Sequence, residues 1–281
     1  MGAVVLQVVG TLLLLDVIVQ CGFARVLIAF FERRPRLRAR AYPRHSQAGC
    51  FTAQTTDGLT LRGSVIRTSG NQADGVIVYC HEFGGDRWSY QGHCSRQILE
   101  THDLVTFDFR NHGQSEAEAN YQPTHWLTTR ELADVQAVID WVQSRPEWAG
   151  RPLMLMGVSR GANAALAAAA TRSVAGVVAV GAFSTLDLAF HHLLDGIRRY
   201  APIFFKVRFP HWHIRSTLML AVRWSGLRQG VSFIGLERMI RRLEPDKMLF
   251  IAGSDDSHIP VAFQTELADR VPGAEFWTVP G

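Results

Sequence analysis

The stretch LMLMGVSRGANAALAAAAT, residues 153–171, decides the fold of this chain. Its apolar beginning, residues 153–156, predicts a buried strand, and its small-residue end, residues 162–171, predicts a helix. Between them stands GVSRG, a turn so tight that only glycines fit on either side of Ser159. The serine hydroxyl is thereby lifted to the end of the strand, where the helix N-terminus faces any negative charge that develops. Ser159 is therefore a candidate nucleophile; the alternative is a serine that caps a helix after a glycine turn.

A second apolar strand, residues 75–79 (GVIVY), runs into the glycine-containing loop CHEFGG. A loop at this position can aim backbone N–H groups at a reaction centre. Together with GVSRG, it resembles the α/β-hydrolase superfamily, whose His-Gly-x-x loop forms an oxyanion hole. The resemblance implies that the N–H groups of Phe83 and Arg160 hold the oxyanion. Glu82 stands where the family usually has Gly, and we expect its carboxylate to point away from the site.

A third strand, residues 104–107, leads into DFRNHGQS, residues 108–115. This segment resembles the family's Asp-x-Arg-Gly-His-Gly-x-Ser loop, with Asn111 in place of a Gly. Asn tolerates the left-handed conformation that Gly would supply, so the replacement is physically mild. In the family the loop is structural, so the resemblance implies that His112 is a scaffold residue rather than a base.

The apolar strand at residues 248–252 precedes GSDDSHIP, residues 253–260. The family's acid loop reads Gly-x-x-Asp-x-x-Val/Ile-Pro, and this alignment selects Asp256 over Asp255. Its implied task is to hold the catalytic imidazole in the right tautomer and to stabilise the imidazolium. An Asp-rich turn before a helix that starts near Pro260 is an equally valid description, and both can hold together.

The catalytic base is missing from the expected place. In the family the base follows the last strand, here residues 274–279, and only Pro280 and Gly281 come after it. All eleven histidines precede that point. His258 lies two residues beyond Asp256 in the same loop, where it can hardly bridge Asp256 and Ser159. We expect the base loop and a final helix to belong to a longer chain; a catalytically inactive member of the family is the alternative.

The remaining pattern fits the same fold. Residues 51–55 and 59–66, joined across Thr56-Asp57-Gly58, predict an opening hairpin. Strands alternate with apolar periodic segments that predict helices at residues 87–100, 127–143 and 261–270, and a further strand is predicted at residues 174–180. Such alternation predicts an α/β fold with a mostly parallel sheet covered by helices on both faces. We assign residues 45–281 to this domain.

Residues 3–31 are almost entirely apolar. Residues 4–24 are long enough for a bilayer span, which needs about 20 apolar residues, at the cost of the single carboxylate of Asp16. A cleaved signal peptide fits less well, because no Lys or Arg precedes the run and no small-x-small site stands out. The alternative is an apolar helix docked on the domain, or lying in the membrane interface with Asp16 turned outward.

An arginine cluster follows the apolar run, accompanied by the single acid Glu32: Arg33, Arg34, Arg36, Arg38, Arg40 and Arg44. By the positive-inside rule, the cluster predicts a single-pass membrane protein with the domain on the cytoplasmic side and the N-terminus outside. It can also attract anionic headgroups. Residues 1–44 are therefore predicted to be a membrane anchor with a basic juxtamembrane segment.

A predicted cap insertion occupies about residues 184–247. From residue 187 to 247 eleven Lys or Arg stand against five Asp or Glu, a net charge of +6, while the whole chain carries only +4. Aromatics are interleaved with these basic residues, but no nucleic-acid-binding motif accompanies them. A membrane-facing lid and a solvated helical face are the two interpretations that we keep. The chain has four cysteines, Cys21, Cys50, Cys80 and Cys94, and their spacing fits neither a metal site nor a disulfide framework.

The sequence as a whole predicts a membrane-anchored serine hydrolase that cleaves carboxylic esters, or thioesters or amides, and needs neither a metal nor an organic cofactor. Its expected partners are a small-molecule or lipid-like acyl substrate and a membrane, and no nucleic acid. The superfamily includes esterases, lipases, thioesterases and aminopeptidases, and the motifs do not separate them. A catalytically inactive protein whose cap binds a lipid or a partner remains the alternative.

Overall fold

The computed structural model describes residues 2–32, 39–69, 72–200 and 210–280. The chain forms two compact units, one of Met1–Pro35 with Ala189–Ser232 and the other of Arg36–Leu188 with Phe233–Gly281. We call them the helical unit and the sheet unit. The helical unit thus brings the N-terminal segment together with part of the predicted cap insertion. The predicted boundaries at residues 44, 184 and 247 stay predictions.

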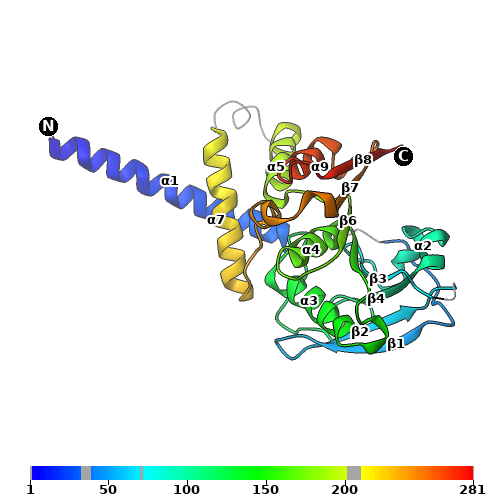
Figure 1. Ribbon diagram of the computed structural model, residues 1–281. Helices are drawn as coiled ribbons and strands as arrows, with labels where there is room; N and C mark the ends of the chain where they lie inside the picture. The colour runs from blue at the N-terminus through cyan, green and yellow to red at the C-terminus, as the bar shows by residue number, and fades with distance from the viewer. Residues whose placement is uncertain (1, 33–38, 70–71, 201–209, 281) are drawn as a thin grey trace. The chain divides into compact units, whose positions relative to one another are not determined.

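One eight-stranded sheet organises the sheet unit (Figure 1), in the order β1-β2-β4-β3-β5-β6-β7-β8. β1 and β2 pair antiparallel, as the predicted hairpin requires, β2 pairs antiparallel with β4, and the other neighbours are parallel. The strands are β1 (Gly49–Gln54), β2 (Thr60–Ile66), β3 (Gly75–Cys80), β4 (His102–Phe107), β5 (Leu153–Val158), β6 (Gly176–Val180), β7 (Met248–Gly253) and β8 (Glu275–Val279).

Burial along the strands follows their place in the sheet. Every residue of β3 is buried, as expected for a parallel strand covered on both faces. β8 lies at the edge of the sheet, and the side chain of Trp277 in it is 53% exposed. The apolar runs therefore correspond to central strands, whereas the residues of the last strand, β8, are mostly exposed to solvent.

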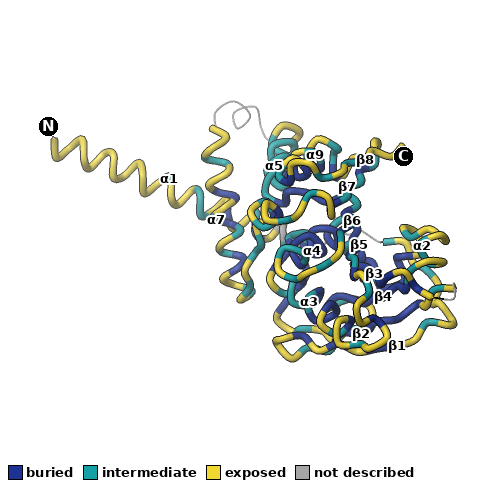
Figure 2. The backbone as a smooth tube through the Cα atoms, in the orientation of Figure 1, coloured by how far each residue is buried: buried dark blue, intermediate teal, exposed yellow. Residues whose placement is uncertain are grey.

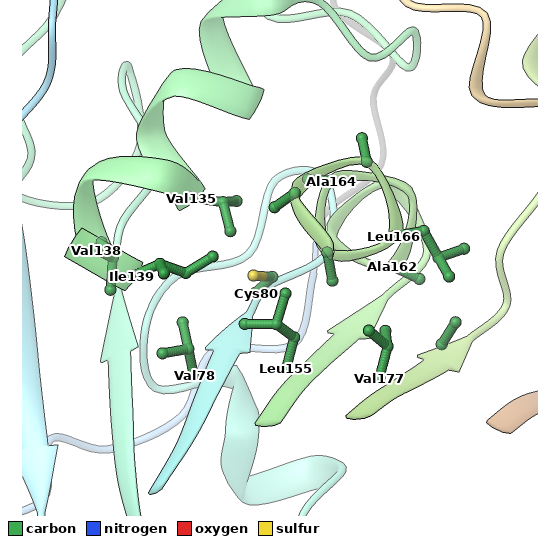
Figure 3. Close-up of a cluster of buried hydrophobic side chains, with 14 of the residues drawn as sticks. Val78, Cys80, Val135, Val138, Ile139, Leu155, Ala162, Ala164, Leu166 and Val177 are labelled. Carbon is green, nitrogen blue, oxygen red and sulfur yellow. The ribbon is translucent and has the colours of Figure 1, made fainter. Parts of the chain in front are cut away.

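Helices cover both faces of the sheet, as predicted. α3 (Thr129–Gln143) and α4 (Arg160–Ala169) pack on the face that carries Val78 and Leu155 (Figure 3). α9 (Val261–Ala268) packs on the same face. The short α2 (Arg96–Thr101) covers the other face. Five of the six alanines of α4, all but Ala169, are completely buried, so this helix lies close against the sheet. Shorter helical segments are η1 (Ser89–Gly92), η2 (Pro146–Trp148), α8 (Leu236–Met239), η3 (Ile240–Arg242) and η4 (Pro245–Lys247).

The prediction of one helix over residues 87–100 is wrong. A 3₁₀ turn, η1, ends at Gly92, and α2 begins only after the extended Ser95. Trp88 and Tyr90 are both buried, and side chains two positions apart cannot share one face of an α-helix. Gly92 also packs against Tyr42, whose Cζ would lie 2.8 Å from an added Cβ. Anchoring of the two aromatic rings therefore overrides the helical pattern.

The helical unit contains α1 (Gly2–Phe31), α7 (His211–Gln229) and most of α5 (Thr185–Tyr200). Within α1, Gly2–Ala29 is long and apolar enough to cross a membrane. A helix near the N-terminus with these properties is also what a signal sequence looks like. In the predicted arginine cluster, Arg33, Arg34, Arg36 and Arg38 lie outside the described residues.

Candidate active site

The topology of the sheet identifies one edge where a site can form. From β3 the chain passes to β4 on one side and then to β5 on the other side of β3. In open α/β sheets the loops diverge at such a point and leave a crevice beyond the carboxyl ends of the strands. The loop after β3 and the turn after β5 are the two motifs that the sequence singled out, and they meet at this position.

Ser159 occupies a strained turn between β5 and α4. Its φ of 54° and ψ of −121° lie in a region that side-chain-bearing residues rarely adopt. Its N–H donates to the Val180 carbonyl at 2.7 Å, and its own carbonyl accepts from Ala162 N at 2.9 Å and Asn163 N at 3.2 Å. The backbone of the serine is thus fixed by β6 on one side and by α4 on the other.

The two glycines beside Ser159 are required by backbone packing. A Cβ at Gly157 would lie 2.6 Å from Ala162 Cα, inside the first turn of α4. A Cβ at Gly161 would lie 2.5 Å from the His81 carbonyl oxygen and would also collide with the Cys80 carbonyl. The predicted reason for both glycines is therefore correct, and the turn is pressed directly against the loop that follows β3.

His81 connects the loops that follow β3 and β4. Its ring is buried; Nε2 accepts a hydrogen bond from Phe109 N at 3.1 Å, and Nδ1 donates to the Glu82 carbonyl at 2.7 Å. Burial, together with the positive charge of Arg160, lowers the pKa of His81 to about 4. The ring is therefore neutral at physiological pH and acts as a fixed link beneath the site.

Phe83 and Arg160 each offer a backbone donor at this edge. Within the described part of the chain, neither of their N–H groups donates a hydrogen bond to another group. The Phe83 ring faces the Arg160 guanidinium at 5.5 Å and the rings of His112 and His125 at 5.9 and 4.9 Å. The two predicted donors thus belong to neighbouring residues whose side chains are in contact.

Arg160 is held from below by Glu131, a residue that the sequence analysis missed. Its Nη2 lies 2.5 Å from Glu131 Oε1, although its N–H directions are not aligned for a hydrogen bond. Glu131 also accepts from Thr128 N and Oγ1 at 3.0 and 2.6 Å and from Tyr121 Oη. Burial raises the pKa of Glu131, but Arg160 and these donors outweigh it and leave that pKa below its usual range. The Thr128-x-x-Glu131 spacing, a capping box at the start of α3, is the signal that could have found it.

The loop after β4 is a rigid scaffold, as predicted. Asn111 adopts the left-handed conformation with φ 59°, and its side chain bonds to the backbone of Glu118 and Tyr121. The fully buried Arg110 pairs with Asp134 at 2.6 Å. His112 Nδ1 donates to the Arg110 carbonyl at 2.9 Å. Burial and the nearby His81 and Arg160 lower the pKa of His112 to about 3, so this ring, too, stays neutral.

Asp256 is placed in the loop after β7. Its Oδ1 accepts from the backbone N–H groups of His258 and Ile259, both at 2.9 Å, while the exposed Asp255 accepts from Ser254 Oγ. The end of β8 lies beside this loop, because Ser254 N donates to the Val279 carbonyl at 2.8 Å. A residue that follows β8 would therefore enter the site next to Asp256.

Glu82 folds back over its own loop. Its carboxyl carbon would lie 2.7 Å from a Cβ added at Gly85, and its buried Oε2 has no hydrogen-bond partner among the residues that the structure describes. The ring of His258 is exposed. Among the described residues, Ser159 Oγ forms no hydrogen bond to any histidine. In the same residues, no cluster of three His, Cys, Asp or Glu side chains could hold a metal ion.

Sequence relatives place these features in a family. Residues 77–281, well over half of the chain, match the Alpha/beta hydrolase family. A segment of 167 residues is 27% identical to the uncharacterized protein YfhR of Salmonella typhi and of Salmonella typhimurium, and covers 58% of this chain and 54% of each relative. The chain thus spans about half the length of the curated relatives that it matches.

Solved structures share the fold at low identity. An esterase of Pyrococcus furiosus, Pf2001, superposes with a TM-score of 0.61 and 19% identity, over 86% of this chain and 88% of that one. XC6422 of Xanthomonas campestris, a serine hydrolase without a lid, superposes with a TM-score of 0.52 and 15% identity, over 86% and 87% of the two chains. The family match and the shared sheet lead to one conclusion: the chain belongs to the Alpha/beta hydrolase family.

Proposed function

We propose that this protein is a membrane-anchored serine hydrolase of carboxylic esters, with Ser159 as its nucleophile. The observation that carries the proposal is the strained backbone of Ser159 at the point where β3 and β5 diverge. A φ of 54° at a residue other than glycine costs free energy that the surrounding packing must offset. Such strain is concentrated at functional sites, and here it presents a hydroxyl at the end of the strand.

In the proposed mechanism Ser159 Oγ attacks the substrate carbonyl and forms a tetrahedral intermediate. The N–H groups of Phe83 and Arg160 stabilise its negative oxygen, supported by the positive end of the α4 dipole. A histidine takes the serine proton and passes it to the leaving alcohol, and Asp256 orients that histidine. Water then releases the acyl group by the same steps in reverse order.

The proposed base follows β8 in the chain. This assignment is supported by the hydrogen bond between Ser254 and Val279, which brings the end of β8 beside the loop of Asp256. It is supported also by the neutral, fully engaged rings of His81 and the scaffold position of His112. A histidine encoded within about ten codons after Gly281 is the expected base.

The serine assignment is tested with a fluorophosphonate probe on the protein extended through that histidine. We expect labelling of the wild type and its loss in Ser159→Ala. Ser173→Ala is the matched control, because Ser173 is exposed in the loop before β6, and it should label normally. Labelling that survives Ser159→Ala would reject the nucleophile. An unlabelled but folded wild type would instead favour the inactive, lipid-binding or partner-binding alternative.

The proposed location is the cytoplasmic face of a membrane, with a lipid-like or small acyl ester as substrate. Support comes from the length and apolarity of α1 and from the arginines that follow it in the sequence. We expect the protein to stay with membranes after an alkaline carbonate wash, and protease added to intact cells to spare the sheet unit. Release by the wash would overturn the anchor, and digestion from outside would overturn its orientation.

A further inference from the structure

The two halves of α1 have different surroundings. All of residues 2–15 are exposed, which Figure 2 shows as an uninterrupted yellow tube. α7 crosses the second half of α1 (Figure 1), and the buried and half-buried residues of α1 lie in this half. Five buried or half-buried residues spaced four positions apart lie on one face of the helix and form a stripe, here called the seam: Asp16, Gln20, Ala24, Ile28 and Glu32. The half-buried Cys21 and Leu27 lie beside it.

At the first turn of the seam a polar cluster joins the two helices. Asp16 Oδ1 lies 2.7 Å from His213 Nε2, at the beginning of α7. Gln20 Nε2 lies 3.0 Å from Asp16 Oδ2 and 3.1 Å from the same imidazole nitrogen. The carboxylate that makes α1 costly to insert in a bilayer is therefore paired with a residue almost two hundred positions away in the sequence.

At the other end of the seam, a second carboxylate, that of Glu32, also has partners in α7. Ser225 Oγ donates to Glu32 Oε1 at 2.9 Å, and Arg228 Nη2 lies 3.5 Å from Glu32 Oε2. Between the two ends, Arg25 lies 5.4 Å from the centre of the Trp224 ring. In the described residues of α1, every charged side chain thus has a partner in α7.

The middle of the seam is tightly packed. Ala24, Ile28 and Ala221 are at most 1% exposed and form one apolar cluster. Alanines at a helix crossing let the two backbones approach closely, as in helix pairs inside membranes. If α1 were removed as a leader peptide, α7 would lose the partner that covers Ala221 and the one that pairs with His213. This packing favours an α1 that stays in the mature protein.

The order of the pairs sets the direction of α7. His213 meets Asp16 and Arg228 meets Glu32, so the His213 end of α7 lies toward the exposed half of α1. A hydrocarbon core of about 30 Å takes about 20 residues of helix. Counted from Gly2, such a span ends near Cys21, more than one turn beyond Asp16. A span over these residues of α1 therefore places the first turn of α7 inside the membrane boundary.

The composition of α7 suits a membrane surface. None of its 19 residues is Asp or Glu, and its cations include Arg215, Arg223 and Arg228. Trp212, beside His213, is 68% exposed, and tryptophan is the residue favoured at the boundary between lipid and water. Arginines further along the helix complement anionic headgroups.

We propose that α7 is the second element of the membrane anchor: α1 is retained, and the first turn of α7, around Trp212 and His213, enters the lipid interface beside Asp16. The inference rests on the proposed membrane location, and it assigns a membrane-inserted surface to the cap insertion. Its occupant is the headgroup and upper acyl-chain region of a bilayer that contains anionic lipid.

The depth of α7 is measured with an environment-sensitive fluorophore on single cysteines. Trp212→Cys and Leu227→Cys are compared in a Cys21→Ser/Cys50→Ser background, with the unsubstituted background as the labelling control. Leu227 is the matched control, since it is 84% exposed at the other end of the same helix. In vesicles of phosphatidylcholine and phosphatidylglycerol, we expect blue-shifted emission and several-fold stronger quenching by brominated acyl chains at position 212. Equal, water-like emission at both positions would overturn the inference.

The Asp16–His213 pair is tested by rescue. His213→Leu should remove the imidazole partner of Asp16, leave its carboxylate with the hydrogen bond from Gln20, and lower the fraction of protein that floats with vesicles several-fold. Asp16→Leu/His213→Leu should restore flotation, because no carboxylate remains to be paired. Unchanged flotation of His213→Leu would contradict the pairing. Failure of the wild type to float would overturn the membrane location itself, whereas a floating wild type with a water-exposed position 212 would overturn only the insertion of α7. Neither measurement depends on hydrolase activity.

Discussion

Two apolar helices of this molecule have opposite surroundings. α4 is buried along almost its whole length, whereas residues 2–15 of α1 are exposed throughout. Their compositions explain the difference: α4 consists mainly of alanine with one leucine, and the exposed half of α1 carries valines and leucines. The small side chains of α4 allow its backbone to contact the backbone of the neighbouring loop. The large aliphatic side chains of α1 are stabilised only where other apolar groups pack around them.

The comparison shows that apolarity alone does not say what covers a helix. In α4, no side-chain atom can be added at Gly161, because its Cβ would collide with the carbonyls of Cys80 and His81. In α1, nothing lies within 4 Å of a Cβ added at Gly10. Side-chain size and the closeness of neighbouring backbone therefore distinguish a helix buried in protein from one that the protein leaves uncovered.

The largest contrast is expected for glycine substitutions in the two helices. Gly161→Ala should destabilise the sheet unit by about 4 kcal/mol or more, because its Cβ meets backbone atoms that cannot move aside. Gly10→Ala should leave unfolding of the sheet unit unchanged and favour the helix locally by about 1 kcal/mol. Urea unfolding in detergent, followed by tryptophan fluorescence, measures both. A fully stable Gly161→Ala would refute the close approach of α4 to the loop after β3.

A smaller contrast is expected for changes of side-chain volume. Ala165 is completely buried in α4, so Ala165→Leu should overpack the core and cost about 1–3 kcal/mol. Leu13 is 62% exposed, so Leu13→Ala should alter stability in detergent by less than about 0.5 kcal/mol. The same variant should weaken partitioning into vesicles by about 2 kcal/mol, since about three methylene-sized groups are lost. Equal destabilisation by both substitutions would remove the distinction between the two helices.

A pH-dependent effect is also expected, and it belongs to the sheet unit. The pKa of His81 is lowered to about 4, so between pH 6.5 and 4 the unfolded chain binds a proton that the folded chain does not. Stability is therefore complete above pH 6.5 and falls as the pH drops, by at most about 1.4 kcal/mol per pH unit for this group. His81→Gln should flatten the slope of the unfolding free energy against pH. An unchanged slope in His81→Gln would contradict the buried, neutral ring of His81.

Local patterns predicted the parts of the fold that depend on near neighbours in the sequence. The predictions of the central strands and of the turn around Ser159 were correct. Apolar runs and a Gly-x-Ser-x-Gly turn can each be recognised from a few consecutive residues. The helix over residues 87–100 was wrong because Trp88 and Tyr90 are anchored by the sheet, which lies far away in the sequence. Glu131 was missed because its role depends on Arg160, which belongs to another helix.

The sequence by itself determined the order of strands and helices, the left-handed Asn111 and the presence of an apolar N-terminal helix. Only the tertiary structure decided which residues meet across long separations. It paired Asp16 with His213, placed the carboxylate of Glu131 under Arg160 and brought the end of β8 beside Asp256. The physical reason is that backbone conformation is set by local sterics and hydrogen bonds, whereas the partner of a buried charge is whichever group the packed chain brings within reach.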